Sequence, residues 1–332
     1  MAAWQSSLTQ LCTICLCAIF AYFPVSISSS QHQPTQRKAP WDHPQCSAKN
    51  RKTWVPPITD RKFRLVLPYG NCPDIESQKF GCHGQRNEDC KIYKRFFKDS
   101  PLLNQGFFVE MGGYDGASFS NSFIFEQCLG WKGMLIEAHP TNYLKMIENR
   151  PCTWNVWGAV CSPETTASHT FMIHDFIEST VNVSEIADYN ANQPADSPNI
   201  KRVKLSPCRS MSSIFLEANV TVIDFFSLDV EGAEYDVLKS IDFTRVRINV
   251  LMVESNMLGN RDPAVPHYYN STLKMEKITA LLTSGPAKMI KLPVEGKLLP
   301  ACVRKRKRLM IRVFDLHDSQ LFVHPSLRDD VC

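Results

Sequence analysis

Carboxylates stand in and beside a glycine-rich turn, an arrangement that selects for particular ligands. The stretch FFVEMGGYDGASFSNS carries Glu110 at the end of an apolar run and Asp115 inside the turn. Gly112 and Gly116 permit the backbone to turn sharply and to approach a ligand closely. Carboxylates a few ångströms from a phosphate would repel it strongly in a partly dry site. The chemistry expected at this turn is therefore the binding of a cationic group.

Two common nucleotide-binding motifs are absent from this turn. The dinucleotide motif G-x-G-x-x-G needs a glycine where Tyr114 stands, and no Gly-Lys-Ser/Thr follows as in a P-loop. S-adenosylmethionine has an α-ammonium and a sulfonium and no phosphate, so it fits an acidic turn. A second carboxylate should then hold the ribose hydroxyls about 20 residues further on, after the next strand. Glu137 stands at about that spacing. The alternative is a glycine turn with an exposed acid and no ligand.

Strands and helices must bring these residues together, and the apolar pattern predicts that they alternate. We expect strands at 107–111, 133–138, 153–160, 168–174, 223–230 and 248–255, and helices after an N-cap at Ser118, from His139-Pro140, after 230 and at 271–283. A short helix is expected at 89–97, a long surface loop at 175–207, and antiparallel edge strands in AKMIKL, LMIRVF and QLFVH. This pattern predicts an α/β fold with a mostly parallel, doubly wound sheet.

The predicted sheet places four acids at one edge. Ligands of such sheets lie at the carboxyl ends of the strands, near the switch in strand order. Glu110, Glu137, Asp229 and Glu254 each stand at or beside the end of a predicted strand. Asp229 and Glu254 could also hold a hard cation through oxygen ligands, although no third ligand is evident, so no metal site is predicted.

The N-terminal part of the chain is expected to lie outside this fold. Residues 1–28 contain an apolar run typical of a signal peptide or signal anchor, and 29–62 have the composition of a flexible stem. Residues 63–105 form a small cysteine-containing extension, and 106–328 form the main domain. Either reading of the leader sends the chain into the secretory pathway, with possible membrane association through the leader.

Cysteines and glycosylation sequons agree with that compartment. Ten of the 13 cysteines follow the leader, and an even number in an oxidising compartment suggests disulfides. Cys128 is expected to be a free buried thiol, and the spacing of Cys72, Cys82 and Cys90 does not favour zinc. Sequons occur at Asn182, Asn219 and Asn270. The net charge of +4 is mild, so nucleic acid is not expected as a partner.

Three blocks of sequence resemble the FkbM-type methyltransferases. They are GFFVEMGGYDGASFSNS, GWKGMLIEAHPTNYLKMIENRP and IDFFSLDVEGAEYDVLKSI. The resemblance is greatest to the eukaryotic secretory-pathway branch that includes the insect protein Star, and it extends over about 106–324. It implies a class I methyltransferase-like, Rossmann-like fold, with a seven-stranded sheet whose last strand is antiparallel.

The resemblance also implies roles for individual residues. Glu110, Gly112 and Gly116 match the first cofactor motif, Glu137 matches the ribose-binding acid and Ala159 lies where the adenine is lined. Gly113, where alanine is more usual, Asp115 and Ala138 complete the expected cofactor-binding set.

The DVEGAE block supplies the remaining candidates. Asp229, Glu231 and Glu234 match the family's DxEGxE pattern, and Asp229 could contact the cofactor or act as the base that draws the proton from an acceptor hydroxyl. Acids in the first helical turn, such as Glu231 and Glu234, also stabilise a helix without any ligand. Other candidate bases are His174, His267 and His324.

The expected activity is S-adenosylmethionine-dependent O-methyl transfer to a sugar, glycan or small-molecule hydroxyl in the secretory pathway. The alternative is a catalytically inactive, Star-like module that acts in protein trafficking and cargo export, because a fold does not guarantee chemistry. The sequence predicts no particular acceptor and no oligomeric state.

Overall fold

The structure, a computed structural model, describes most of the main domain and little of the chain before it. The described residues are 46, 82–100, 105–160, 170–174, 178–181, 200–204, 209–230, 233–254, 271–292 and 319–327. The chain divides into Met1–Gln36 and Arg37–Cys332, and every described residue belongs to the second unit. The predicted leader, and the predicted stem apart from Cys46, lie outside the described residues. Within the described part, no helix is long and apolar enough to cross a membrane.

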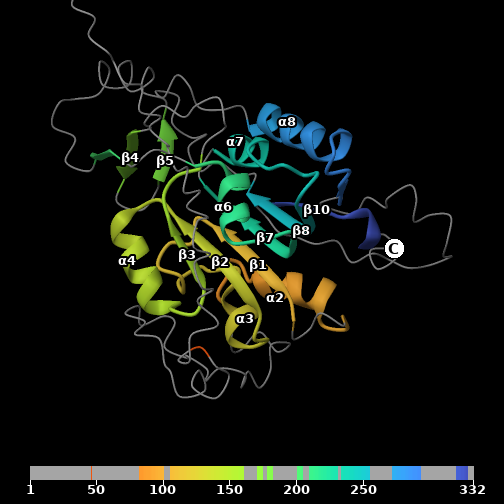
Figure 1. Cartoon of the computed structure of the whole chain (residues 1–332), viewed down its shortest axis with the longest axis horizontal. Helices are drawn as coiled ribbons and strands as arrows, with labels where there is room; N and C mark the ends of the chain where they lie inside the picture. The colour runs from red at the N-terminus through yellow and green to blue at the C-terminus, as the bar shows by residue number, and fades with distance from the viewer. Residues whose placement is uncertain are drawn as a thin grey trace, which may run out of the picture. The chain divides into compact units, whose positions relative to one another are not determined.

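A seven-stranded sheet forms the centre of the domain, as the sequence predicted (Figure 1). Its strand order is β3-β2-β1-β7-β8-β10-β9. All neighbouring pairs from β3 to β8 are parallel, whereas β10 runs antiparallel to both β8 and β9. The strands are β1 Phe107–Met111, β2 Lys132–Glu137, β3 Trp154–Trp157, β7 Val222–Leu228, β8 Arg247–Glu254, β9 Ile290–Lys291 and β10 Ser319–Val323. The expected Rossmann-like methyltransferase fold with one antiparallel strand is therefore confirmed.

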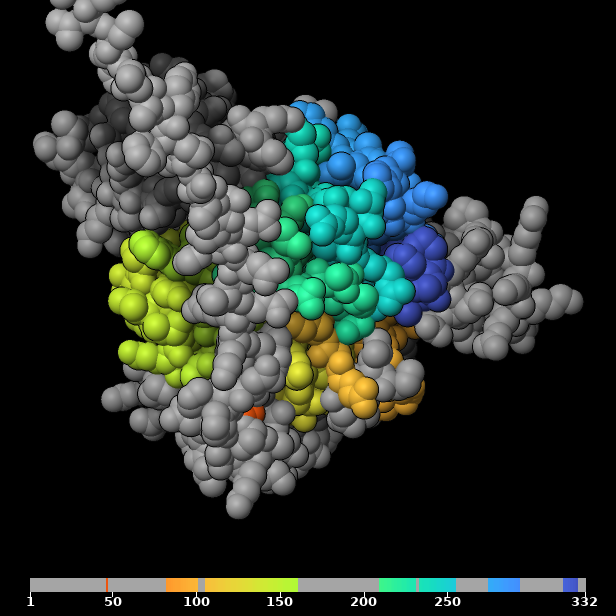
Figure 2. Space-filling model, in the orientation of Figure 1, coloured from red at the N-terminus to blue at the C-terminus, as the bar shows by residue number. Residues whose placement is uncertain are grey.

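Helices cover both faces of this sheet because its strands are apolar on both sides. On one face the buried core joins the sheet to α6 (Met211–Glu217), α7 (Glu234–Lys239) and α8 (Ser271–Ser284). Figure 2 shows α7 and α8 adjoining at the surface of this face. On the other face the core joins it to α2 (Glu88–Ile92), the π-helix η4 (Tyr93–Phe97) and α3 (Phe123–Gln127).

The connections between strands agree with the sequence in some places and differ in others. The predicted helix at His139-Pro140 is α4 (Pro140–Asn149), where His139 is the N-cap and accepts from the amides of Thr141 and Asn142. The helix expected after Ser118 begins four residues later, so that N-cap assignment is wrong. The hydroxyl of Ser118 instead donates to Asp115 at 2.8 Å. Helix α6 was not predicted.

A second, three-stranded antiparallel sheet lies outside the main one. It consists of β4 (Thr170–His174), β5 (Glu178–Val181) and β6 (Ile200–Lys204), in the order β5-β4-β6. The strand expected at 168–174 is therefore present as β4, and it forms a hairpin with β5. The expectation of an unstructured loop at 175–207 is wrong for β5 and β6, whose polar sequences show little alternation.

Two disulfides join described residues. Cys46 pairs with Cys152, which follows α4, and Cys82 pairs with Cys90 in α2. Cys128 is also disulfide-bonded, so its prediction as a free thiol is wrong. The Cys82–Cys90 disulfide thus lies within the cysteine-containing extension, whereas Cys46, from the predicted stem, is linked to Cys152 of the main domain. Reducing conditions should weaken these attachments.

Candidate functional site

Four acids form a row along the carboxyl edge of the sheet. The strand order β2-β1-β7-β8 places Glu137, Glu110, Asp229 and Glu254 at the ends of successive parallel strands. Glu110 faces Leu135 of β2 on one side and Ser227 of β7 on the other. The switch in strand order lies between β1 and β7, which is where open α/β sheets bind their ligands. The structure therefore brings together the acids that sequence spacing selected.

The glycine turn leaves β1 in a conformation that requires glycine. Gly112 has φ of 84°, a left-handed value, and its amide donates to the carbonyl of Ile136 at 3.0 Å. A Cβ at this position would overlap the carbonyl oxygen of Asp229. The close approach that Gly112 permits is thus to the backbone that follows β7. The turn and the DVEGAE segment are packed directly against each other.

The other two candidate glycines contact α4 and the residue after it. A Cβ at Gly113 would come 2.8 Å from the sulfur of Met146, and one at Gly116 would come 3.0 Å from Cγ of Arg150. Gly116 also has a positive φ of 80°. Both positions therefore lack room for a side chain because the turn is seated on α4.

Asp115 holds the turn in shape. It is buried, and its Oδ1 accepts from the amides of Ala117 and Ser118 at 2.9 and 2.7 Å. Its backbone carbonyl accepts from the side chain of Asn149 at 2.8 Å. The carboxylate expected to face a cationic ligand is thus engaged by the turn itself.

Glu110 is likewise bound to the residues that follow the turn. One carboxylate oxygen accepts from the hydroxyls of Ser120 and Ser122, both at 2.6 Å, and the other accepts from the amide of Asn121 at 2.6 Å. The side chain is only 3% exposed. Hydrogen bonds to a carboxylate are short and strong. Glu110 therefore fixes the path of the chain from the turn into α3.

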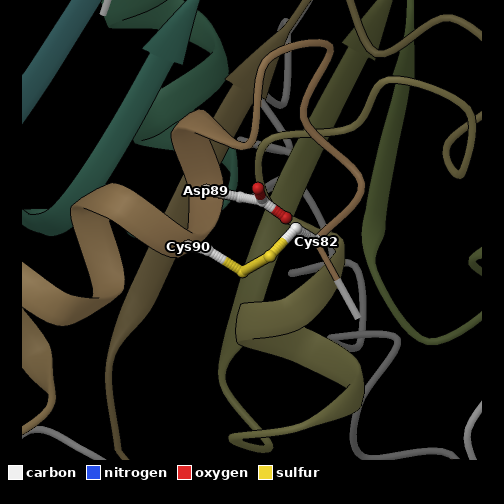
Figure 3. A group of neighbouring side chains, drawn as sticks. All are labelled: Cys82, Asp89 and Cys90. Atoms are coloured by element: carbon white, nitrogen blue, oxygen red, sulfur yellow. A yellow bond between two sulfur atoms is a disulfide. The ribbon is translucent and has the colours of Figure 1, made fainter. Parts of the chain in front are cut away.

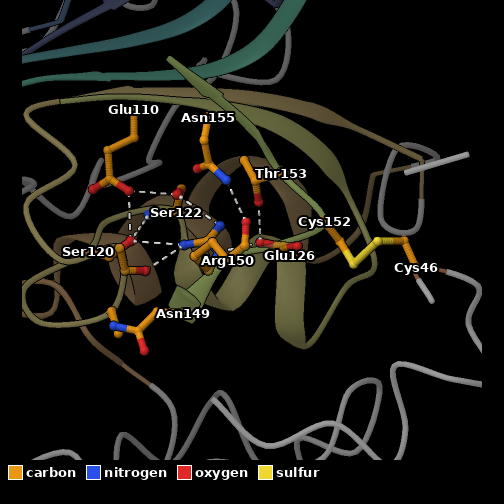
Figure 4. A network of polar contacts seen from close by, with 12 residues as sticks. Cys46, Glu110, Ser120, Ser122, Glu126, Asn149, Arg150, Cys152, Thr153 and Asn155 are labelled. Carbon is orange, nitrogen blue, oxygen red and sulfur yellow. Dashed lines mark hydrogen bonds and ion pairs between the residues drawn. A yellow bond between two sulfur atoms is a disulfide. The ribbon is translucent and has the colours of Figure 1, made fainter. Parts of the chain in front are cut away.

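A buried arginine joins this network from the opposite side (Figure 4). Arg150 is fully buried and forms an ion pair with Glu126 of α3. It also donates to the carbonyl of Gly116 at 2.9 Å, and its guanidinium lies over the rings of Phe108 and Phe123. Sequence reasoning missed Arg150, although it directly follows the amphipathic pattern of α4.

Glu137 lies at the end of β2 with both carboxylate oxygens directed at backbone amides. Tyr114 N donates to one oxygen and His139 N to the other, each at 2.7 Å. Glu137 therefore lies buried beside the glycine turn, to which it is hydrogen-bonded.

The two alanines of the predicted cofactor set lie on neighbouring segments. The carbonyl of Ala138 accepts from the indole N–H of Trp157 at 3.1 Å, and that indole is 45% exposed. Ala159 is buried and its carbonyl accepts from the amide of Arg209. The amide of Gly158 donates to the carbonyl of Glu137 at 3.0 Å, which ties the end of β3 to the end of β2.

Asp229 follows the last residue of β7 and is exposed to solvent. Protein atoms nevertheless crowd its carboxyl group, and this desolvation raises its pKa to about 6. A hydrogen bond with Glu254 opposes the rise, whereas the charges of Glu234 and Glu110 add to it. Carboxyl groups with a raised pKa often occur at functional sites. Asp229 is thus suited to exchange a proton near neutral pH.

Glu234 extends the acidic group at the start of α7. Oxygens of Asp229, Glu234 and Glu254 lie within 4.8 Å of one another, so the third acid that the sequence did not reveal is present. Lys274 of α8 forms a buried ion pair with Glu234 and supplies positive charge there. Binding of a hard cation by these acids stays an alternative, and no metal site is predicted here. Glu231 lies outside the described residues.

Of the candidate histidine bases, only His324 can be placed relative to this edge among the fully described residues. His324 follows the antiparallel strand β10, and its amide donates to Asn249 near the amino end of β8, opposite Glu254. Burial is the largest cause lowering its pKa. His174 ends β4 in the small sheet, and His267 lies outside the described residues.

Comparisons with known proteins give one sequence match and distant structural likenesses. The profile described as methyltransferase FkbM domain matches residues 110–283. No curated protein matches in sequence. A human methyltransferase 10 domain containing protein is 10% identical with a TM-score of 0.30, covering 72% of this chain and 79% of its own. The mitomycin 7-O-methyltransferase MmcR is 14% identical with a TM-score of 0.23, covering 59% and 48%. At such scores these two likenesses carry no argument about function.

Proposed function

The chain belongs to the FkbM methyltransferase domain family, and from this premise we propose that it is an S-adenosylmethionine-dependent O-methyltransferase. The observation that carries the proposal is the row of acids at the switch in strand order, formed by Glu137, Glu110 and Asp229. This edge suits a cationic adenosyl donor and would repel a diphosphate. The fold alone would not distinguish these ligands.

The proposed position of the cofactor is along this edge, beside the acids. Glu137 would accept hydrogen bonds from the two ribose hydroxyls. Ala138 and Ala159 would line the adenine, and the exposed carboxyl of Asp229 would face the methionine end. Glu110, Gly112, Gly113, Asp115 and Gly116 would act by holding the turn beneath the cofactor.

The acceptor would be a hydroxyl of a sugar, a glycan or a small molecule. Methyl transfer forms a bond between the acceptor oxygen and the methyl carbon, while the carbon–sulfur bond breaks and its electrons return to sulfur. Asp229 would take the hydroxyl proton, since an acid with a pKa near 6 is a usable base at neutral pH. Alignment of the two reactants would supply most of the remaining acceleration.

The proposed compartment is the secretory pathway. Disulfides between described cysteines are typical of proteins that fold in an oxidising environment. Asn219 of one sequon is exposed, in the turn after α6. Both features support entry into that pathway, through a cleaved or an anchoring leader.

A second candidate is the catalytically inactive trafficking module. One observation favours it: the carboxylates of Glu110 and Asp115 are already bound by hydroxyls and amides of the turn. A turn that satisfies its own acids keeps its shape without any ligand. Binding of the cofactor separates the two candidates.

Calorimetric titration of the full chain with S-adenosylmethionine tests the proposal. We expect micromolar binding that is lost in Glu137→Gln, because the amide can accept from only one of its partners. Glu148→Gln on α4 is the matched control and should bind normally. Absence of binding by the wild-type protein would favour the trafficking module.

A further inference from the structure

The two cysteines of the Cys82–Cys90 disulfide differ in their exposure to solvent. Cys90 lies in α2 and is completely buried, whereas Cys82 is partly exposed and precedes the exposed residues Gln85 and Arg86. Thiol–disulfide exchange depends on which sulfur an attacking thiolate can reach and on how readily the other sulfur leaves. A thiolate from solvent would therefore attack Cys82 and displace Cys90.

A buried carboxyl group lies beside this disulfide (Figure 3). One oxygen of Asp89 lies within 4.8 Å of both sulfurs, and the side chain has no solvent exposure. Its Oδ2 accepts from the amide of His83 at 2.7 Å, whereas its Oδ1 has no hydrogen-bond partner among the described residues. A buried acid with an unsatisfied oxygen needs a proton or a partner. A sulfur within 4.8 Å of this carboxyl oxygen becomes a candidate partner for that proton once the disulfide is broken.

Burial favours the protonated form of Asp89, and backbone hydrogen bonds from His83, Cys90 and Gly84 oppose it. Burial is the largest cause that raises its pKa, to about 7, and the charge of Glu88 on the same helix adds to the rise. His83 packs against it from the preceding segment, and burial lowers the pKa of that imidazole to about 4, so it is neutral. The charge of Asp115, in the glycine turn, raises the pKa of His83, and the charge of Arg150, which follows α4, lowers it.

We propose that Cys82 and Cys90 form a thiol–disulfide exchange site in which Asp89 supplies and recovers the proton of Cys90. The co-reactant is a dithiol, either a small molecule or a protein with two neighbouring thiols. This activity does not depend on methyl transfer.

The exchange balances in two steps. A thiolate of the dithiol attacks Sγ of Cys82, the bond between the two cysteines breaks, and its electron pair goes to Sγ of Cys90, which takes the proton of Asp89. The second thiol then loses its proton and attacks the reductant's own sulfur in the mixed disulfide, expelling Cys82 as a thiolate. The two protons released by the dithiol pass through water to Asp89 and Cys82. The dithiol leaves as a disulfide, and the reverse reaction uses Asp89 as the base.

Reduction would loosen a segment that braces the glycine turn. His83 contacts the carbonyl of Ala117 at 3.0 Å through Nδ1, and its ring stacks on Phe123 with centroids 4.0 Å apart. Gly84 forms a backbone bridge with Phe119. An effect of reduction on cofactor binding therefore rests on the proposed function, whereas the exchange itself does not.

The experiment measures reduction of the full-length protein by dithiothreitol between pH 5 and 9, without cofactor. Free thiols are alkylated at set times, and mass spectrometry quantifies Cys82 and Cys90, with the buried Cys46–Cys152 pair as the internal reference. We expect the rate per reductant thiolate to fall as pH rises through about 7, because the acid form of Asp89 is lost. Asp89→Asn should remove this dependence and slow the reaction at pH 6 by about tenfold or more.

Asp99→Asn, which alters an exposed acid after the same helical segment, is the control and should behave as wild type. A wild-type rate per thiolate that is equal at pH 6 and pH 8 would overturn the proposal, as would equal rates in Asp89→Asn and Asp99→Asn. If Asp89→Asn fails to fold by circular dichroism, the wild-type pH profile alone decides. Failure of S-adenosylmethionine to bind would leave these outcomes unchanged.

Discussion

Arg150 donates to the backbone carbonyl of Gly116 at 2.9 Å, so the residue that follows α4 holds the glycine turn in place. The same guanidinium is paired with Glu126 and is fully buried. Because Glu110 reaches the same serines that Arg150 contacts, the turn is fixed by one continuous buried network. The shape of the candidate cofactor site thus depends on charges that need never touch the cofactor.

Replacing Arg150 by methionine should destabilise the protein and weaken cofactor binding. The change leaves Glu126 buried without its counter-charge, which typically costs about 3–5 kcal/mol. Denaturant unfolding measures the free energy. Arg209→Met is the control, because its ion pair with Glu217 is exposed and should contribute at most about 1 kcal/mol.

The double variant Arg150→Met/Glu126→Gln separates stability from site geometry. Removing the orphaned charge should recover part of the lost stability. Affinity for S-adenosylmethionine should stay low, since the carbonyl of Gly116 still lacks its donor. Full recovery of affinity together with stability would show that Arg150 acts only through folding.

Gly112→Ala should lower stability more than Gly158→Ala. Both glycines have positive φ, 84° and 145°, so both substitutions strain the backbone. A Cβ overlaps the carbonyl of Asp229 only at Gly112, whereas nothing lies within 4 Å at Gly158. Comparing the thermal unfolding of the two variants separates the effect of the steric overlap at Gly112 from the backbone strain that both share. Equal losses would mean that the contact between the turn and the segment after β7 is not close in solution.

The raised pKa of Asp229 predicts a pH dependence with a definite sign. Between its ordinary value of 3.8 and about 6, the folded chain holds a proton that the unfolded chain releases. This group therefore contributes most to stability below pH 3.8, and the contribution is lost as pH rises through 6. Asp229→Asn should remove that slope from the difference between variant and wild-type unfolding curves. An unchanged slope would place the titrating group elsewhere.

Affinity for the cationic cofactor should rise with pH, whereas the contribution of Asp229 to stability falls with pH. Ionised Asp229 attracts a positive ligand, so binding of S-adenosylmethionine should strengthen as pH rises through about 6. Calorimetric titrations at pH 5 and pH 7 give the ratio of the two affinities. Asp229→Asn should show no such change.

Glycosylation of Asn219 tests the proposed compartment. The side chain is exposed in a turn, so an oligosaccharyltransferase could reach it. Expression of the full chain in a secretory host should give a glycan that glycosidase treatment removes and that Asn219→Gln lacks. An unmodified Asn219 in protein recovered from the secretory pathway would contradict the expectation for this site.

The sequence was most informative about the sheet, because long apolar runs such as those of β7 and β8 predict buried parallel strands with little ambiguity. It located Glu110, Glu137, Asp229 and Glu254 at one edge for the same reason. Short or polar elements were harder to predict, because β5 and β6 lack a clear alternation. Helix α3 begins only after Ser122, because the hydroxyl of Ser118 is bound to Asp115 and that of Ser120 to Glu110.

The hydrogen-bond partners of the acids could not be predicted from the sequence. Spacing indicates that Glu110 and Asp115 lie near a ligand, but it does not show that serine hydroxyls and amides 2 to 12 residues later bind them. Arg150 was missed because a single charge after an amphipathic helix is usually solvated. Its burial becomes visible only when α3 and α4 are packed together.

The most direct test is the crystal structure of the protein in complex with S-adenosylhomocysteine. The proposed function predicts difference density along the carboxyl edge, with the ribose hydroxyls at Glu137 and the homocysteine end beside Asp229. Density that places the ligand away from these two carboxylates, or a diphosphate bound between them, would contradict it.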